Sequence, residues 1–432
     1  MEWLTSLVDC FTIGDPVSKP PTGKQVCSND NTSFTIKIKA SNYSQGRIVE
    51  EDTINEGIKV KVECRKMWST KCERLSLFQN RLIILIVIAF IIMHLMFYLT
   101  DEKLKTPERK SWEKVQYDKK FVLVTGGAGF VGHHVIMRLK QDNINVIGTD
   151  NFNDYYNVSL KYLRSNISGV VQHVDVCDLK KMTEIIATKK ITHVIHLAAQ
   201  AGVRYSLTNP QAYVKSNVEC FVQLLETLKN TGIPLIYASS SSVYGKNTNI
   251  PFSEDHPVVQ PASLYAATKR ENELLAHVYW NLYKQRSVGL RFFTVYGPLG
   301  RPDMAYFSFA KNIFKGLPIP VFNFGKLSRD FTYIDDIVNG IIKCIDVKYD
   351  YEILNLGRGE PQSLMQFIKT IEDIAGKKAV LDFKEMVKGD VLVTYADVSK
   401  AKASIGYSPN VSLKDGLTRF ISWYKLYSNQ PK

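Results

Sequence analysis

Apolar positions occur in short, regularly spaced runs over the middle of the chain, and stretches with helical spacing separate them. A continuous apolar run is typical of a strand buried on both faces. Strands that alternate with helices form a parallel sheet. The pattern therefore predicts an α/β fold with a Rossmann-type, doubly wound parallel sheet. The runs are FVLVT (121–125), NVIGTD (145–150), VVQHVDV (170–176), HVIHLAA (193–199), PLIYASS (234–240) and SVGLRFF (287–293).

The same pattern divides the chain into five segments. Residues 1–80 are polar and aperiodic, so we expect a disordered N-terminal arm. Residues 82–99 are apolar, and residues 100–119 form a charged stem. Residues 120–296 carry the strand–helix alternation expected of a dinucleotide-binding Rossmann domain. The alternation loosens over residues 297–432, which predicts a smaller mixed α/β domain for the substrate, with some chain returning to the sheet.

Residues 82–99, LIILIVIAFIIMHLMFYL, contain one polar residue, His94. A membrane-spanning helix needs about 17 to 25 apolar residues, so this run predicts one N-terminal transmembrane helix. Basic residues flank it about equally, but Arg81 adjoins one end whereas Asp101 and Glu102 adjoin the other. We therefore expect a single-pass, type II protein in the Golgi, with residues 120–432 in the lumen.

The net charge and the cysteines limit the kinds of ligand and partner that we expect. The net charge is +13, but no dense basic block or nucleic-acid motif is present, so we expect solvated lysines and a site for an anionic substrate. None of the seven cysteines shows metal-ligand spacing, and we predict no metal. Cys177, Cys220 and Cys344 follow the apolar run. Their scatter does not resemble a disulfide framework, and we interpret Cys177 and Cys344 as small core residues.

The segment TGGAGFVG (125–132) follows a predicted strand and opens a predicted helix. This is the position at which glycines let the backbone approach a pyrophosphate, which the free N–H groups of the helix then bind. We expect cofactor contacts from Gly126, Gly129, Phe130, Val131 and Gly132.

Two carboxylates end the next two strands. Asp150 can accept hydrogen bonds from the adenosine ribose, and its charge repels a 2′-phosphate, which favours NAD over NADP. Its alternative role is to cap a helix. Asp175 ends the third strand, where it either contacts the adenine or serves only the turn.

Candidate catalytic residues follow in two segments, SSSSVYG (239–245) and Tyr265-Ala-Ala-Thr-Lys269. On a helix Lys269 lies beside Tyr265, four residues earlier. An ammonium group and a positive nicotinamide ring would both lower the tyrosine pKa toward neutrality. Tyr265 could then act as a general base.

These motifs together resemble the extended short-chain dehydrogenase/reductases of the NAD-dependent epimerase/dehydratase family, and within it the UDP-glucuronate 4-epimerases. The resemblance extends from about residue 120 to 428. It is carried by TGGAGFVG, DNFNDYY (150–156), HLAAQAGVRYS (196–206), SSSSVYG, YAATK, TVYGPLGRPDMA (294–305), SRDFTYIDD (328–336) and GDVLVTYAD (389–397).

The resemblance implies the roles of the catalytic residues. Tyr265 would be the base, Lys269 its partner and a cofactor contact, and Ser240 a hydrogen-bond partner of the reacting hydroxyl. The sugar would pass through a 4-keto intermediate while NAD accepts and returns a hydride. Ser241 and Ser242 would contact the substrate. Related dehydratases and decarboxylases have acidic residues there, so the two serines favour simple epimerisation.

The resemblance also implies the UDP-sugar contacts. Thr294 and Arg301 match positions that hold a sugar carboxylate, and Arg329 matches a diphosphate ligand whose planar guanidinium grips two oxygens. Arg204 is a further candidate. Asp390 matches the ligand of the uridine ribose, although Lys388 stands where the family usually has proline.

Three alternatives remain open. A 4-epimerase of UDP-glucose and UDP-galactose would typically have Asn in place of Thr294, and a UDP-glucuronate decarboxylase would have Glu in place of Ser242. An NAD-binding sensor or scaffold would commonly lack Tyr265 or Lys269. The resemblance also implies a homodimer formed through a helix pair.

Overall fold

The computed structural model describes residues 113–114, 119–386 and 391–429, and these contain a seven-stranded parallel sheet. The strand order is β12-β7-β6-β5-β2-β3-β4. The strands are β2 (Phe121–Thr125), β3 (Asn145–Asp150), β4 (Val171–His173), β5 (His193–His196), β6 (Leu235–Ser240), β7 (Ser287–Phe292) and β12 (Tyr351–Leu356). The predicted Rossmann-type sheet is thus confirmed.

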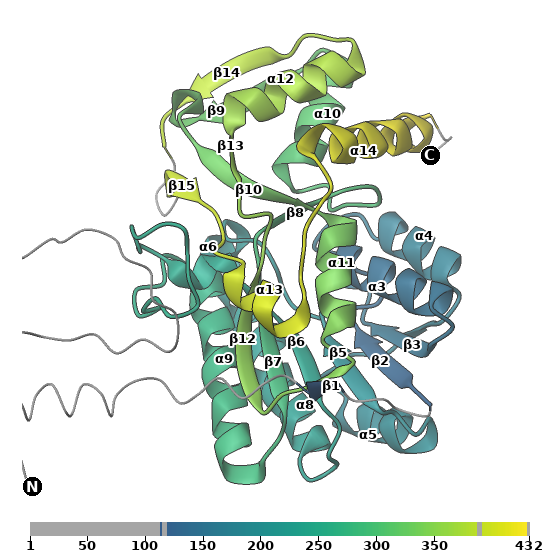
Figure 1. Ribbon diagram of the computed structural model, residues 1–432. Coiled ribbons are helices and arrows are strands. Elements are labelled where there is room, and N and C mark those ends of the chain that lie inside the picture. The colour runs from purple at the N-terminus through teal and green to yellow at the C-terminus, as the bar shows by residue number, and fades with distance from the viewer. Residues whose placement is uncertain (1–112, 115–118, 387–390, 430–432) are drawn as a thin grey trace, which may run out of the picture. The chain divides into compact units, whose positions relative to one another are not determined.

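Side chains alternate between the two faces of this sheet, as strand geometry requires. Val122 and Val124 of β2 pack into one hydrophobic cluster, whereas Leu123 packs into another on the opposite face. Helices cover both faces (Figure 1). They are α3 (Phe130–Gln141), α4 (Ser159–Ser168), α11 (Ile334–Lys343) and α13 (Ser399–Ile405), and opposite them α5 (Leu179–Thr188), α8 (Cys220–Leu228) and α9 (Leu264–Tyr283).

A second layer lies beyond the carboxyl ends of the parallel strands (Figure 1). Its central strand, β10 (Ser328–Tyr333), pairs with β8 (Thr294–Tyr296), β13 (Pro361–Ser363) and β15 (Val393–Thr394). A separate parallel pair consists of β9 (Pro318–Phe322) and β14 (Val380–Lys384). The helices of this layer are α10 (Ala305–Lys315), α12 (Leu364–Ala375) and α14 (Leu413–Ser428).

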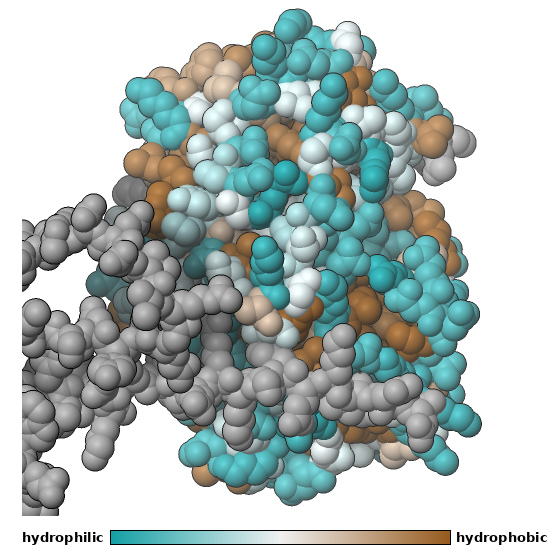
Figure 2. Space-filling model, in the orientation of Figure 1, coloured by the Kyte–Doolittle hydropathy of each residue, from teal (hydrophilic) through white to brown (hydrophobic). Residues whose placement is uncertain are grey.

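The N-terminal segments are almost wholly outside the described residues. The predicted arm and the apolar run 82–99 both fall there, and of the stem only a few residues are described. Two of these, β1 (Glu113–Lys114), pair antiparallel with β11 (Val347–Lys348). Within the described part of the chain, no helix has both the length and the apolar character needed to cross a membrane. On the face drawn in Figure 2, hydrophilic residues predominate and apolar residues form small patches.

One cysteine prediction is wrong. Cys177, in the loop after β4, forms a disulfide with Cys220 at the start of α8, whereas Cys344 is buried and free. The two bonded residues are 43 positions apart, with a Cα–Cα distance of 4.5 Å. The two cysteines meet because α8 packs against the sheet. Asp175 lies beside the pair, but the sulfurs are bonded to each other and offer no metal ligand set.

A buried ion pair ties α9 to the sheet. Glu273 of α9 accepts two hydrogen bonds from Arg291 of β7, at 2.8 and 2.9 Å, and one from Ser239 of β6 at 2.6 Å. Arg270 adds a fourth at 2.9 Å. Burial acts to raise the pKa of Glu273, but the charge of Arg291 and the hydrogen bonds from Arg291, Ser239 and Arg270 together outweigh it, and the pKa lies below the ordinary 4.5. Ser239 immediately precedes Ser240, so this network fixes the strand end that carries the candidate catalytic serine.

Replacing Glu273 by Gln should destabilise the fold, because the Arg291 guanidinium then loses its buried counter-charge. We expect the free energy of unfolding in urea to fall by about 3 kcal/mol at pH 7. The lowered pKa makes this contribution largest above pH 4.5, so the difference from wild type should shrink as the pH falls below that value. Glu271→Gln, on the exposed side of the same helix, is the control. Equal stability of the two variants would contradict the prediction.

Candidate active site

The turn between β2 and α3 is built for close backbone approach. Gly126 has φ +71°, and its carbonyl oxygen accepts a hydrogen bond from the Gly129 N–H at 2.9 Å. A Cβ at Gly132 would lie 2.2 Å from that same carbonyl oxygen. Helix α3 begins after Gly129 with no side-chain cap, so N–H groups of its first turn are free to bind an anion. All five residues expected to contact the cofactor line the cavity above this turn.

Asp150 is placed both to cap the turn and to face the cavity. One carboxylate oxygen accepts the Ala128 N–H at 3.1 Å, and the other accepts the Phe152 N–H at 2.8 Å. The Lys161 amine, which the sequence analysis missed, lies 3.8 Å from the second oxygen. Capping and ribose binding are therefore compatible, because a carboxylate has several acceptor sites.

Asp175 lies at the same end of the cavity. It accepts hydrogen bonds from the Asn151 side chain at 3.0 Å and the Cys177 N–H at 2.9 Å. The disulfide partner Cys220 also lines the cavity, so the covalent link stands at this wall.

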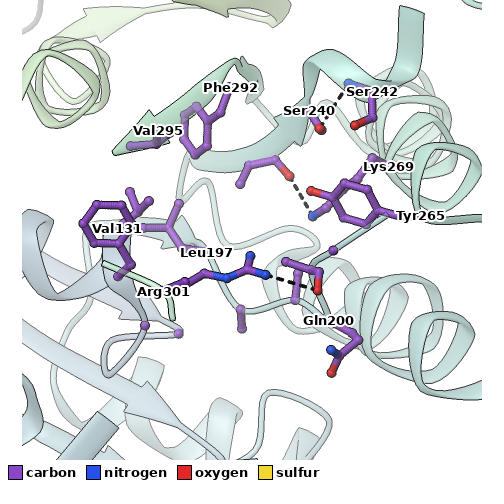
Figure 3. A pocket seen from close by; sticks show the side chains of 18 of the residues that line it. Val131, Leu197, Gln200, Ser240, Ser242, Tyr265, Lys269, Phe292, Val295 and Arg301 are labelled. Atoms are coloured by element: carbon purple, nitrogen blue, oxygen red, sulfur yellow. Dashed lines mark hydrogen bonds between the residues drawn. The ribbon is translucent and has the colours of Figure 1, made fainter. Parts of the chain in front are cut away.

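A cavity of about 470 Å³ lies between the sheet and the second layer, above the carboxyl ends of β2, β5 and β6. This is where a doubly wound sheet places its ligands, because the chain leaves β2 and β5 in opposite directions. Ser240 ends β6 and begins a short 3₁₀ turn, Ser241–Tyr244, where its hydroxyl accepts the Ser242 N–H at 3.2 Å. Ser263 caps α9, so that Tyr265 and Lys269 project from its first turns into the same space (Figure 3).

The environment of Tyr265 differs from the prediction in the role of Lys269. Burial raises the pKa of Tyr265 above 10, while a hydrogen bond with Ser240 and the charge of Arg301 act to lower it. Lys269 does not supply the expected lowering. Its amine instead donates to the Ala238 carbonyl at 2.9 Å, and burial lowers its own pKa to about 8. Any further lowering of the tyrosine pKa would have to come from a positive ligand in the cavity.

Asn217 is a positioning residue that the sequence analysis missed. It is fully buried in a wide-turned helical segment, Val214–Glu219, between α7 (Pro210–Tyr213) and α8. Its amide accepts the Gln200 N–H at 2.8 Å and donates to the Gln200 carbonyl at 3.0 Å and to Thr268 at 3.1 Å. Asn217 thereby connects the loop after β5 to the helix turn between Tyr265 and Lys269. No local motif marks it, because its partners are distant in sequence.

Arg164 is a third missed residue, and it connects the glycine-rich turn to the loop before Arg301. Its fully buried guanidinium donates to the Ala128 carbonyl in the glycine-rich turn at 3.1 Å. It also donates to the carbonyls of Leu299 and Gly300, at 2.9 and 3.0 Å, in the loop before Arg301. A fourth bond, at 2.7 Å, reaches the Tyr156 hydroxyl.

Most predicted sugar contacts line the same cavity. Its lining includes Ser241, Ser242, Thr294, Arg301 and Arg329. The Arg301 guanidinium extends toward the loop after β5, where Nη2 donates to the Ala201 carbonyl at 3.4 Å (Figure 3). Arg329 donates to the carbonyls of Ser328 and Leu392.

Two predicted sugar contacts are not placed there. Arg204, which precedes α6 (Tyr205–Thr208), does not line the cavity. Its guanidinium stacks over the Phe322 ring at 4.5 Å, and its contact with the sugar stays a prediction. Asp390 lies outside the described residues.

Comparison with known proteins agrees with this geometry. Residues 122–357 match the NAD dependent epimerase/dehydratase family. UDP-glucuronate 4-epimerase 2 of Arabidopsis thaliana is 46% identical over 332 residues, which cover 72% of this chain and 76% of that protein. UDP-glucuronate 4-epimerase 1 of the same plant is 44% identical over 354 residues, 73% of this chain and 82% of the relative.

Solved structures agree as well. UDP-glucuronic acid 4-epimerase of Bacillus cereus, in complex with UDP-glucuronic acid and NAD, is 36% identical with a TM-score of 0.67, covering 71% of this chain and 99% of that one. UDP-glucose 4-epimerase of Thermotoga maritima, with UDP-glucose, is 29% identical with the same TM-score, covering 72% and 100%. The chain belongs to the NAD-dependent epimerase/dehydratase family.

Proposed function

We propose that this protein is an NAD-dependent UDP-glucuronate 4-epimerase, which interconverts UDP-glucuronate and UDP-galacturonate. The observation that carries the proposal is a single cavity whose lining brings together the glycine-rich turn, Tyr265 with Lys269, and Thr294 with Arg301. The 4-epimerases of Arabidopsis and Bacillus cereus act on, or were solved with, this sugar nucleotide.

The residues at the glycine-rich turn fit NAD. Gly132 leaves no room for a side chain, α3 offers uncapped N–H groups, and Asp150 supplies a carboxylate for ribose hydroxyls. Asp150 also disfavours a 2′-phosphate, as expected for NAD over NADP. NAD, when bound, supplies reversible hydride acceptance from the sugar C4.

The chain's own residues then carry the proton and hold the sugar. Tyr265 takes the proton from the O4 hydroxyl as C4 loses its hydride, and Ser240 holds that oxygen by a hydrogen bond. A 4-keto sugar results. After the sugar turns over, the hydride returns to the opposite face of C4 and Tyr265 returns the proton to O4. No net oxidation occurs, and every atom removed is restored.

Nothing acidic stands at the two positions after Ser240. Ser241 and Ser242 line the cavity but have no group that titrates near neutral pH, so they cannot serve as an acid–base pair for loss of water. Arg301 and Thr294 would hold the sugar carboxylate and restrain its rotation relative to the keto group. Epimerisation is therefore favoured over dehydration and decarboxylation, and Arg301 favours a carboxylated sugar over UDP-glucose.

We also propose that the protein is anchored in the Golgi membrane by residues 82–99, with the catalytic part in the lumen. The length and apolar character of that run support anchoring. The Cys177–Cys220 disulfide supports the lumen, because disulfides persist in oxidising compartments. The acceptor asparagines of the sequons at Asn157, Asn166 and Asn410 are all exposed.

A homodimer is the third element of the proposal. Helix α9 presents Leu274, Val278 and Leu282, four residues apart, and these are 50%, 45% and 61% exposed. Residues at this spacing lie on one helix face. A second copy with the same row would cover both, which is the self-complementary geometry of a two-fold dimer.

Tyr265→Phe should abolish turnover while leaving the binding of UDP-sugar nearly unchanged, because the ring shape persists and only the proton carrier is lost. We expect the wild type to convert UDP-glucuronate to UDP-galacturonate, seen by chromatography, and kcat of the variant to fall at least about a hundredfold. Tyr283→Phe, on the same helix, is the control. A wild type that releases only UDP-pentose would instead identify a decarboxylase.

Full-length protein from microsomes should lose apparent mass on treatment with an N-glycosidase, because the catalytic part faces the lumen. Replacing Asn157, Asn166 and Asn410 by Gln should remove this loss. A loss that persists in the triple variant must come from Asn31 or Asn42, and would reverse the proposed topology.

Val278→Asp should convert the dimer to a monomer, because a carboxylate would be buried without a partner at the centre of the apolar row. Light scattering of the detergent-solubilised full chain would give the mass. Leu426→Asp, on α14 at a residue that is 72% exposed, should leave the dimer intact. A monomeric wild type, or a dimeric Val278→Asp variant, would refute the assignment of this surface.

A further inference from the structure

The guanidinium of Arg301 is already paired with a carboxylate of its own chain. Its Nε donates to one oxygen of Asp303 at 3.0 Å, and its Nη2 donates to the other at 2.5 Å. This is the bidentate arrangement in which arginine also grips a substrate carboxylate. Arg301 lines the cavity, whereas Asp303 holds it from outside that lining, and the two side chains are 20% and 27% exposed.

A tyrosine holds Asp303 from the other side. The Tyr155 hydroxyl donates to the same Asp303 oxygen that Nη2 contacts, at 3.1 Å, and its ring centroid lies 5.7 Å from the guanidinium. Burial, followed by the Asp303 charge, raises the pKa of Tyr155 to about 12, so the phenol remains a donor at neutral pH. Both oxygens of Asp303 therefore have fixed partners.

Asp303 is not needed to shape the loop that carries Arg301. Arg164 already fixes that loop through the carbonyls of Leu299 and Gly300. The Met304 N–H adds a bond to the Arg301 carbonyl at 3.3 Å. Removing only the charge of Asp303 should thus leave the backbone in place. It should change how many N–H groups and how much positive charge the Arg301 guanidinium presents to a ligand.

We propose that Asp303 determines the strength of preference for carboxylated sugars, because it is an internal carboxylate that shares Arg301 with the carboxylate of the substrate. The inference rests on the proposed function, since it assigns the sugar carboxylate to Arg301. Asp303 occupies the Nε and Nη2 edge, so a second carboxylate must approach the remaining N–H groups or displace it. Two carboxylates on one guanidinium repel each other, which weakens binding of UDP-glucuronate and speeds release of its C4 epimer.

The same pairing serves a neutral sugar. When UDP-glucose occupies the cavity, Arg301 keeps its charge partner and no buried cation is left unpaired. Asp303 thus reduces the difference between the affinity for UDP-glucuronate and the affinity for UDP-glucose. Without its charge, the cavity should bind carboxylated sugars more tightly and neutral sugars less tightly.

The test is Asp303→Asn, which keeps the shape and one acceptor oxygen but removes the charge. Like charges about 5 Å apart at an effective dielectric of about 20 can change affinity by more than tenfold, and partial exposure reduces this. We expect KM for UDP-glucuronate to fall about tenfold and kcat to fall with it, because product release slows. The ratio of kcat/KM for UDP-glucuronate over UDP-glucose should rise, and the affinity for UDP alone should stay constant.

Two further variants separate charge from structure. Tyr155→Phe removes a hydrogen bond but keeps the Asp303 charge, so the sugar preference should change far less. In an Arg301→Leu background, Asp303→Asn should no longer tighten UDP-glucuronate, because the shared cation is gone. A KM that rises for both sugars, or an unchanged ratio between them, would overturn the proposal.

Failure of the proposed function would look different. A wild type that turns over no UDP-glucuronate would refute the epimerase assignment. Calorimetric titration of the same variants with UDP-glucuronate and UDP-glucose would still measure the effect of Asp303. If Asp303→Asn binds both sugars as the wild type does, the inference about Asp303 is wrong whatever the reaction.

Discussion

The buried guanidinium of Arg164 is the contact on which the geometry of the cavity depends. It bonds at once to the glycine-rich turn and to the loop before Arg301, and its fourth bond reaches a tyrosine hydroxyl. Among the described residues no carboxylate hydrogen-bonds to this guanidinium, so carbonyl oxygens offset the cost of burying its charge. One side chain therefore holds the glycine-rich turn and the loop before Arg301 next to each other.

Buried polar groups play a similar part on the opposite side. Glu273 and Asn217 each connect three segments around α9, the helix that carries Tyr265 and Lys269. Both make hydrogen bonds to residues of other segments. A satisfied network rigidifies its surroundings, whereas an unpaired buried group is costly. In the network around Glu273, Nη1 of Arg291 is a buried nitrogen without a hydrogen-bond partner among the described residues. Lys269 illustrates the balance: its amine has a carbonyl partner, yet burial still brings its pKa to about 8.

Local patterns in the sequence were sufficient for the main strands, the glycine-rich turn and the Tyr265–Lys269 helix, because each depends on neighbouring residues. Asn217, Arg164 and Asp303 could not be found in this way. Their significance lies in partners that only the fold brings close, or, for Asp303, in a charge pairing that no motif requires. The Cys177–Cys220 bond was missed for the same reason.

Arg204 has a partner that its sequence motif does not indicate. Its position after a strand, in the loop HLAAQAGVRYS, suggested a substrate ligand, but an aromatic ring from β9 lies within reach of its guanidinium. Sequence spacing does not reveal that competing partner. Conversely, Lys161 escaped notice because a lysine on a predicted helix is usually solvated, whereas here it is buried beside Asp150.

The order of the strands has a consequence for how the chain folds. β12 comes from residues 351–356 yet pairs along its whole length with β7, and α11 packs beside α3 on the same face. A chain ending at residue 296 would make β7 the edge strand in place of β12 and would uncover the face of α3 that packs against α11. The dinucleotide-binding layer is thus distinct in chemistry but depends on residues beyond 330 for part of its packing. During synthesis, its long-range pairing must wait until the strand beyond residue 350 emerges, and closing such a distant contact is a slow step in folding.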